Sequence, residues 1–231
     1  MNYFNLDNKI ARLIILQRIE LASNTQKRLR KILGRYIFTN IITKYFISKQ
    51  NVSKKYYRLM LKEYDFLSQF IDFNKKKILS IGSGMCGLEL MIKSKNEDSS
   101  FTIIEKNYVS SKVKYGWDIK NDEAYNDLDL LKKFLLNNGF KKDYRIFDFD
   151  KNNLPEEKFD IIISLYSLDY HYDFYFYLDY LKKVMDKKTL IVFDTIRPNF
   201  FEKIFNHVKI ISSDDDSVHN SKRVICTQLL N

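Results

Sequence analysis

The sequence predicts an α/β fold with a mostly parallel sheet, preceded by a separate helical segment. From residue 77 onward, short apolar runs alternate with stretches of helical periodicity. Three glycines separate the first of these runs from the stretch that follows it. Residues 8–72, in contrast, show helical periodicity and no strand pattern. Continuously apolar strands separated by helices are typical of parallel sheets. We therefore expect a helical cap at residues 1–74 and an α/β domain at residues 75–231.

Positive charge is concentrated in the first third of the chain. The whole protein has 231 residues and a formal net charge of +10. Residues 1–76 hold 16 lysines and arginines against 5 acidic residues, whereas the remainder holds 23 against 24. With 45% hydrophobic residues, the chain has enough apolar material for a packed core. These numbers predict a basic helical cap on a nearly neutral domain.

Cysteine and histidine usage predicts neither a disulfide framework nor a metal site. The chain has two cysteines and three histidines, at positions without ligand spacing. The opening residues lack the pattern of a signal peptide. The most apolar stretch of the basic segment, residues 36–48, includes a lysine, and a spanning helix needs about 20 apolar residues. We expect a cytoplasmic protein with no transmembrane segment and no metal.

The elements follow in order from local pattern. Three helices are expected over residues 8–72, with a break at Gly34; the clearest covers 52–71, where apolar residues recur at i, i+3 and i+4. Strands are then expected at residues 77–82, 101–105, 144–148, 158–165 and 189–194. Helices are expected at residues 87–95, 122–140, 173–185 and 197–205, the second closed by an Asn-Gly cap.

Two further strands are expected at residues 207–213 and 222–230, with no helix between them. The polar loop that joins them has about ten residues, and a parallel crossover needs a dozen or more. The last strand should therefore run antiparallel.

The loop "GSGMCG" after the first strand is a candidate cofactor loop. Gly82, Gly84 and Gly87 form G-x-G-x-x-G, which is weak by itself but here follows a strand and opens a helix. Glu105 ends the next strand, where a carboxylate can bind ribose hydroxyls. A nicotinamide dinucleotide would suit both features. However, only about 145 residues follow the loop, and all are needed to complete one sheet.

Residues 76–231 resemble the class I S-adenosylmethionine-dependent methyltransferases. The resemblance rests on "LSIGSGMCGLEL", on Glu105, on Asp150 four residues before Leu154-Pro155, and on "FDIIISLYSLDYHYD". It implies a Rossmann-like seven-stranded sheet, mostly parallel with an antiparallel last strand, and S-adenosyl-L-methionine as cofactor. Parts of the sequence further resemble methyltransferases that act on small molecules or sugars.

The resemblance also implies a set of cofactor-binding residues. These are Ser80, Gly82, Ser83, Gly84, Gly87, Glu105, Asp150 and Ser164. Asp148 is the alternative to Asp150 for the contact with the adenine amino group. The family usually carries Asp or Glu where this chain has Ser80, so a cofactor-binding pseudo-enzyme or assembly module remains an alternative.

Catalytic and substrate residues are assigned by position. His171 and Asp169 follow the fourth strand and are the candidate general bases for removing a hydroxyl proton. Tyr115 and Trp117 are expected to close over cofactor or substrate. Arg197 is expected to pair with an acidic substrate group or, alternatively, to serve the helix that follows it. The hypothesis is O-methylation of a small, anionic, hydroxylated acceptor such as a sugar.

Other partners remain open. RNA methylation through the basic helices is the second reading. The lysines interleaved with tyrosine, phenylalanine and isoleucine also allow peripheral contact with an anionic membrane. The oligomeric state is unknown, and a nicotinamide oxidoreductase ranks third.

Overall fold

The computed structural model describes residues 2–108, 125–169, 173–212 and 221–230. The chain divides into two compact units. The helical unit comprises Met1–Gln69, Gly84–Ser94 and Lys106–Lys142, and the sheet unit comprises Phe70–Ser83, Lys95–Glu105 and Asp143–Asn231. The glycine-rich segment therefore passes from the sheet unit to the helical unit between Ser83 and Gly84. The boundary expected between residues 74 and 75 stays a prediction.

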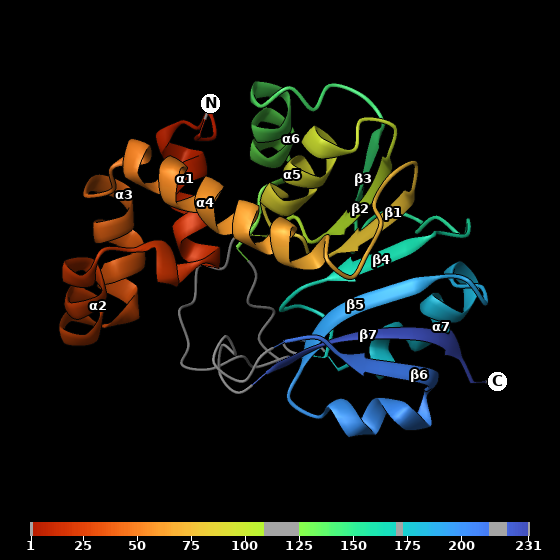
Figure 1. The fold of residues 1–231 in the computed structure, drawn as a ribbon. Helices are drawn as coiled ribbons and strands as arrows, with labels where there is room; N and C mark the ends of the chain where they lie inside the picture. The colour runs from red at the N-terminus through yellow and green to blue at the C-terminus, as the bar shows by residue number, and fades with distance from the viewer. Residues whose placement is uncertain (1, 109–124, 170–172, 213–220, 231) are drawn as a thin grey trace. The chain divides into compact units, whose positions relative to one another are not determined.

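The strands of the sheet unit form one mixed sheet (Figure 1). Within the described residues the strands are β1 Lys77–Ile81, β2 Ser100–Glu105, β3 Tyr144–Asp148, β4 Ile161–Ser164, β5 Leu190–Thr195, β6 Phe205–Ile210 and β7 Lys222–Leu229. Their order is β3-β2-β1-β4-β5-β7-β6. β7 pairs antiparallel with both β5 and β6, while the pairs among β1 to β5 are parallel. The predicted seven-stranded, mostly parallel sheet with an antiparallel last strand is confirmed.

The strand order places a topological switch point between β1 and β4. The chain builds outward from β1 through β2 to β3, and from β4 to β5 on the other side. In register, Ser80 of β1 lies between Ile103 of β2 and Ile163 of β4. The carboxyl ends of β1 to β5 meet at one edge, which is where open α/β sheets bind their ligands.

An aromatic cluster anchors the core of the sheet unit. Helix α7, Tyr175–Val184, and the 3-10 turn η4, Pro198–Lys203, contribute to this core. The ring of Phe201 lies 4.9 Å from that of Phe174 and 4.8 Å from that of Phe193, in edge-to-face geometry. Each such buried ring stabilises the fold by about 1.5–3 kcal/mol.

The segment after β5 differs from expectation. A helix was predicted over residues 197–205, but only the six-residue turn η4 forms. The chain must extend from Phe205 onward to pair with β7, because Phe205 lies opposite Leu229. Sheet pairing therefore limits the helical stretch here.

The helical unit is formed from α1 to α4 together with α5 and α6. The bounds are α1 Asn8–Gln17, η1 Ile19–Leu21, α2 Asn24–Ile37, the π-helical η2 Phe38–Ile42, α3 Thr43–Tyr45, α4 Lys49–Leu67, α5 Gly87–Lys95 and α6 Leu128–Asn137. Gly34 interrupts α2 with φ +79°, as its position predicted. α4 begins earlier than expected because Ser48 caps it by accepting a hydrogen bond from the Asn51 N–H.

Contacts within the helical unit fix α1 against α4 and α6. Phe4 packs on Tyr56 of α4 and Phe134 of α6, with ring centroids 5.4 and 5.3 Å away. Asp7 caps α1 by accepting from the Ile10 N–H and also pairs with Lys133 of α6 at 2.7 Å. Among the residues that the structure describes, none of the helices combines the length and apolarity required to cross a bilayer.

Candidate functional site

Gly82 occupies the switch point and admits no side chain. Its φ of +66° lies in the left-handed region, and its N–H donates to the Ile104 carbonyl at 3.0 Å. A Cβ at this position would collide with the side chain of Ser167, which follows β4. Ser167 was not among the predicted residues, although it belongs to the "SLYS" stretch at the end of β4.

Ser164 ties the end of β1 to the loop after β4. Its Oγ donates to the Ile81 carbonyl at 2.8 Å and accepts from the Leu168 N–H at 3.1 Å. Ser80, within β1, is also buried, whereas Ser83 is half-buried. These contacts give Ser164 a positioning function at the switch point. Its predicted contact with a cofactor stays a prediction.

Acidic residues end β2, which is next to β1, and β3, which is next to β2. Glu105 at the end of β2 lies opposite Asp148 at the end of β3. Asp148 is buried; its Oδ1 accepts from the Asp150 N–H at 3.1 Å, and its own N–H donates to Asn152 at 2.7 Å. Asp150 lies in the turn that follows and is exposed. Both candidates for the adenine contact, Asp148 and Asp150, therefore lie at the carboxyl edge on the side of Glu105 that faces away from β1. The choice between them stays a prediction.

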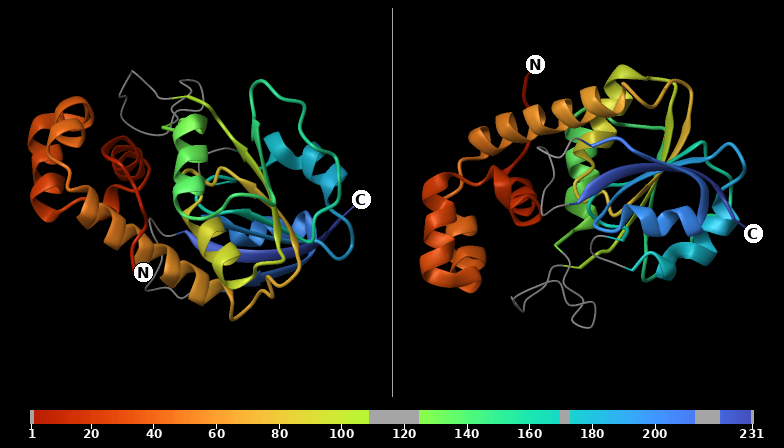
Figure 2. Two further views of the ribbon diagram at one scale, coloured as in Figure 1. Left: turned by 90° about the horizontal axis from the view of Figure 1, so that it is seen from above. Right: turned by 60° about the horizontal axis from the view of Figure 1, so that its bottom comes forward.

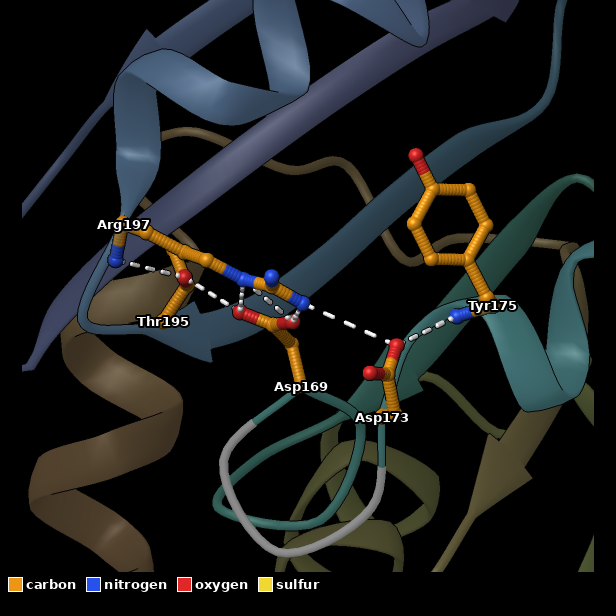
Figure 3. A network of polar contacts seen from close by, with 5 residues as sticks. All are labelled: Asp169, Asp173, Tyr175, Thr195 and Arg197. Atoms are coloured by element: carbon orange, nitrogen blue, oxygen red, sulfur yellow. Dashed lines mark hydrogen bonds and ion pairs between the residues drawn. The ribbon is translucent and has the colours of Figure 1, made fainter.

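Asp169 and Arg197 form an ion pair at the same edge (Figure 3). Nη2 and Nε of Arg197 donate to Asp169 Oδ1 at 2.5 and 3.1 Å. Thr195, the last residue of β5, donates from its hydroxyl to Oδ2 at 2.5 Å and accepts from the Arg197 N–H at 2.9 Å. The loop after β4 and the turn after β5 are thereby joined.

The exposure of the two partners differs sharply. The Asp169 side chain is 0% exposed and that of Arg197 is 40% exposed. Arg197 also lies 3.7 Å from Asp173 and 4.3 Å from the centre of the Phe200 ring. The hydrogen bond with Asp169, followed by the attraction of both carboxylates, raises the pKa of Arg197 despite its partial burial. In this arrangement the Asp169 carboxylate is the partner of Arg197 and is shielded from water. Its function as a general base stays a prediction.

A second ion pair also supports the loop after β4. Asp194 of β5 accepts from Arg223 of β7 at 3.0 Å, and both side chains are buried. The other Asp194 oxygen accepts from the Tyr166 N–H at 3.2 Å. Tyr166 and Asp169 have φ values of +59° and +61°. Such backbone is unfavourable for bulky residues, and the two ion pairs hold it in place.

In the helical unit, the continuation of the glycine-rich segment contacts α1. Oε1 of Gln17 accepts from the Met85 N–H at 3.1 Å, while its Nε2 donates to the Tyr125 carbonyl at 2.5 Å. Gly84 has φ +61°, and a Cβ there would lie 2.6 Å from Gln17 Oε1. Gln17 therefore covers the backbone of the segment at Gly84 and Met85.

Tyr56 of α4 reaches the first residue of α5. Its hydroxyl accepts from the Gly87 N–H at 3.1 Å, and a Cβ on Gly87 would lie 2.5 Å from Tyr56. Burial raises the pKa of Tyr56, so the phenol stays neutral. Neither Gln17 nor Tyr56 was predicted, because each is separated from the segment by 30 residues or more.

The remaining predicted residues lie outside the described part of the chain. They are His171, Tyr115 and Trp117. In the residues that the structure does describe, no cluster of three or more His, Cys, Asp and Glu side chains has metal-binding geometry.

Comparison with known proteins identifies the fold. No family model matches the chain, and no curated protein matches it. Solved structures do match. A SAM-dependent methyltransferase from Aquifex aeolicus aligns with a TM-score of 0.51 and 11% identity, covering 75% of this chain and 93% of that one. A methyltransferase from Pyrococcus furiosus aligns with a TM-score of 0.49 and 14% identity, covering 88% and 98%.

The mitomycin 7-O-methyltransferase aligns with a TM-score of 0.49 and 10% identity, covering 78% of this chain and 56% of that one. The chain spans only about half the length of several structures that it matches. At 11% identity, the likeness to the Aquifex aeolicus structure establishes the fold alone. It is the Rossmann-like methyltransferase fold that the sequence predicted.

Proposed function

We propose that this protein transfers a methyl group from S-adenosylmethionine to a hydroxyl oxygen of a small acceptor. The observation that carries the proposal is the arrangement at the carboxyl edge of the sheet. Gly82 follows β1, and Glu105 ends the neighbouring β2. A glycine-lined switch point beside a strand-end carboxylate suits an adenosyl ligand in an open α/β sheet.

The residues at this edge fit that cofactor. Glu105 is half-buried, so its carboxylate can accept hydrogen bonds from two ribose hydroxyls. No lysine lies between Gly82 and Gly87, which suits a ligand without phosphates. Phe149 comes directly after Asp148 and packs on Phe176 and Tyr177. It offers an apolar surface next to the acidic turn where an adenine would bind.

The cofactor supplies the activated methyl group when bound. The protein then has to align the acceptor oxygen and remove its proton. Arg197 presents a guanidinium that is 40% exposed and already oriented by Asp169. We assign it to an anionic group of the acceptor, such as a carboxylate or phosphate on a sugar. Because Asp169 and Asp173 offset its charge, selectivity depends on hydrogen-bond geometry more than on net charge. His171 remains the proposed base.

Calorimetric titration tests cofactor binding. The protein is titrated with S-adenosylhomocysteine, S-adenosylmethionine and NAD, and so is the Glu105→Ala variant. We expect both adenosyl ligands to bind, and Glu105→Ala to weaken them by about 10- to 100-fold, the value of charge-assisted hydrogen bonds. The matched control is Asp98→Ala, which removes an exposed carboxylate just before β2 and should leave the affinity unchanged.

Two results of the titration would contradict the cofactor assignment. Binding of NAD alone would assign the loop to a nicotinamide cofactor. Binding of none of the three ligands would support a degenerate module, and Ser80→Asp would then test whether the missing charge is the cause. If the adenosyl ligands bind, transfer of a labelled methyl group is measured with sugar phosphates, sugar acids and RNA as acceptors. Labelling of RNA alone would overturn the small-acceptor assignment.

A further inference from the structure

Helix α2 carries an apolar stripe that is not buried. Leu29, Ile32 and Leu33 stand at i, i+3 and i+4 and so share one face of the helix. Ile32 is 78% exposed and Leu33 is 39% exposed. None of the α2 side chains that the structure describes is buried. An amphipathic helix normally packs its apolar stripe on a core, so this one is available to a partner.

The two helical segments that follow α2, which are η2 and α3, also expose apolar side chains. Arg12 of α1 donates to the Thr43 hydroxyl and to the Thr39 carbonyl, both at 3.2 Å, which fixes one side of η2 and α3 against α1. Ile41 and Tyr45 each stand two positions after these threonines. Two positions in a helix correspond to roughly half a turn. They therefore point away from α1, and they are 46% and 66% exposed.

Local hydrogen bonds hold α2 and α3 together. Ser23 and Gln26 form a reciprocal cap at the start of α2, in which each backbone N–H donates to the other side chain. Nε2 of Gln26 also donates to the carbonyl of Phe46 at 2.7 Å. Phe46 itself is 66% exposed. The exposed side chains are thus carried on an ordered scaffold.

The stretch of sequence that carries these side chains has charges of a single sign. Between Glu20 and Glu63 the sequence contains 11 lysines and arginines and neither aspartate nor glutamate. Within the helical unit, α2 and α3 lie at the N-terminal end of α4, away from α5 and α6, in all three views (Figures 1 and 2). An anionic partner can therefore approach them without meeting either of those helices.

We propose that this basic–apolar surface docks on an anionic lipid bilayer. It is defined by Ile32, Leu33, Ile41, Tyr45 and Phe46 with the lysines and arginines around them. Apolar side chains that enter the acyl boundary and cations that pair with headgroups are the two requirements of interfacial binding. Single-stranded RNA instead binds through stacking on aromatic rings. Tyr45 and Phe46 offer such rings, but Ile32, Leu33 and Ile41 offer none and are exposed beside the cations. This aliphatic share of the surface favours lipid.

Vesicle co-sedimentation of the full chain, without any cofactor, tests this surface. The vesicles are phosphatidylcholine alone or phosphatidylcholine mixed with phosphatidylglycerol. We expect sedimentation only with the anionic vesicles. Ile32→Ser/Leu33→Ser should lower the partition coefficient at least about tenfold through lost apolar burial. Arg28→Glu/Lys31→Glu should lower it by roughly fivefold or more for each charge removed from the surface.

Matched controls use residues elsewhere on the chain. Leu136→Ser/Leu230→Ser removes two leucines that are 50% and 41% exposed. Lys187→Glu/Lys188→Glu makes the same charge change in an exposed turn before β5. Both controls should sediment like the original protein, and thermal melting should show that all four variants are folded.

The proposal is overturned if Ile32→Ser/Leu33→Ser and its control Leu136→Ser/Leu230→Ser sediment alike. It is also overturned if Arg28→Glu/Lys31→Glu and its control Lys187→Glu/Lys188→Glu lose binding equally, since that would indicate unspecific attraction. It is also overturned if the protein ignores anionic vesicles but binds a labelled RNA oligonucleotide, with Ile32→Ser/Leu33→Ser leaving RNA affinity unchanged.

Discussion

The buried Asp169 carboxylate holds the guanidinium of Arg197 through hydrogen bonds of 2.5 and 3.1 Å, while Thr195 donates to the second carboxylate oxygen. Arg197 therefore has a fixed orientation before any acceptor arrives. The carboxylate is 0% exposed, so its charge acts on Arg197 rather than on solvent. This pair links two loops that follow neighbouring parallel strands.

The first prediction concerns the energetic coupling of this pair. Asp169→Asn, Arg197→Gln and the double variant are compared by urea denaturation. Because the aspartate is buried and the arginine partly so, we expect a coupling free energy of about 1–2 kcal/mol. Additive effects of the two substitutions would show that the contact contributes nothing. The affinity for S-adenosylhomocysteine should stay unchanged in all three variants.

Gly82 should tolerate alanine much less well than Gly139. Both have positive φ, but a Cβ on Gly139 meets nothing within 4 Å, whereas one on Gly82 meets Ser167. Gly139→Ala should cost about 1–2 kcal/mol of unfolding free energy from backbone strain alone. Gly82→Ala should cost about 3 kcal/mol or more. Adding Ser167→Gly should bring Gly82→Ala close to the Gly139→Ala value; no such rescue would mean that Ser167 is not the obstacle.

The buried ion pair between Asp194 and Arg223 should matter far more than an exposed one. Asp194→Ala removes a buried carboxylate from a buried guanidinium and should destabilise the fold by about 3–5 kcal/mol. The control is Glu156→Ala, which breaks an exposed pair with Lys183 and should have little effect on stability, because solvent screens this pair. Chemical denaturation measures both. Equal losses of stability in Asp194→Ala and Glu156→Ala would contradict the conclusion that burial makes the Asp194–Arg223 pair matter more.

Cys226 should be inert in the folded protein. Burial raises the pKa of its thiol to about 12, so almost no thiolate is present at pH 8. In a Cys86→Ala background, modification by iodoacetamide should proceed only as fast as the protein unfolds. Rapid stoichiometric labelling at pH 8 without denaturant would contradict this prediction.

Asp186 should give a pH-dependent contribution to stability. Hydrogen bonds from the Lys188 N–H, and then from Thr189, lower the pKa of this carboxyl from 3.8 despite some desolvation. A lowered folded-state pKa means that the stabilisation is fully present above pH 3.8 and is lost as the pH falls through the folded value. Asp186→Ala should thus lower stability at neutral pH, but only slightly, because solvent screens this exposed carboxylate. The difference should vanish in acid, and Lys187→Ala should show no such pH dependence.

The places of the strands along the chain and the parallel direction of most of them were predictable, because apolar runs alternate with helical stretches; the order of the strands in the sheet comes from the structure. The antiparallel direction of β7 followed from the short connection before it. The segment after β5 was not predictable in the same way, because the pairing of Phe205 with Leu229 overrides a local helical pattern. Helix ends shifted where a cap outside the apolar pattern, such as Ser48 or Asp127, decides the first turn.

The candidate site was predictable only in part. Gly82 and Glu105 could be assigned because strand ends of a parallel sheet meet at one edge. The contacts of Gln17 and Tyr56 with the glycine-rich segment could not, since they depend on how distant helices pack. The pairing of Asp169 with Arg197 was missed for the same reason. Both residues had been singled out, but for separate tasks.

The position of β7 bears on how the chain is made. The strand that separates β5 from β6 is the last along the sequence, so β5 cannot gain its second neighbour until residues 222–229 have been synthesised. A nascent chain that stops at Ser221 leaves one edge of β5 unpaired and β6 without its partner strand. Truncations there should aggregate during translation, and fusion partners at this end need a linker long enough to leave β7 free to insert.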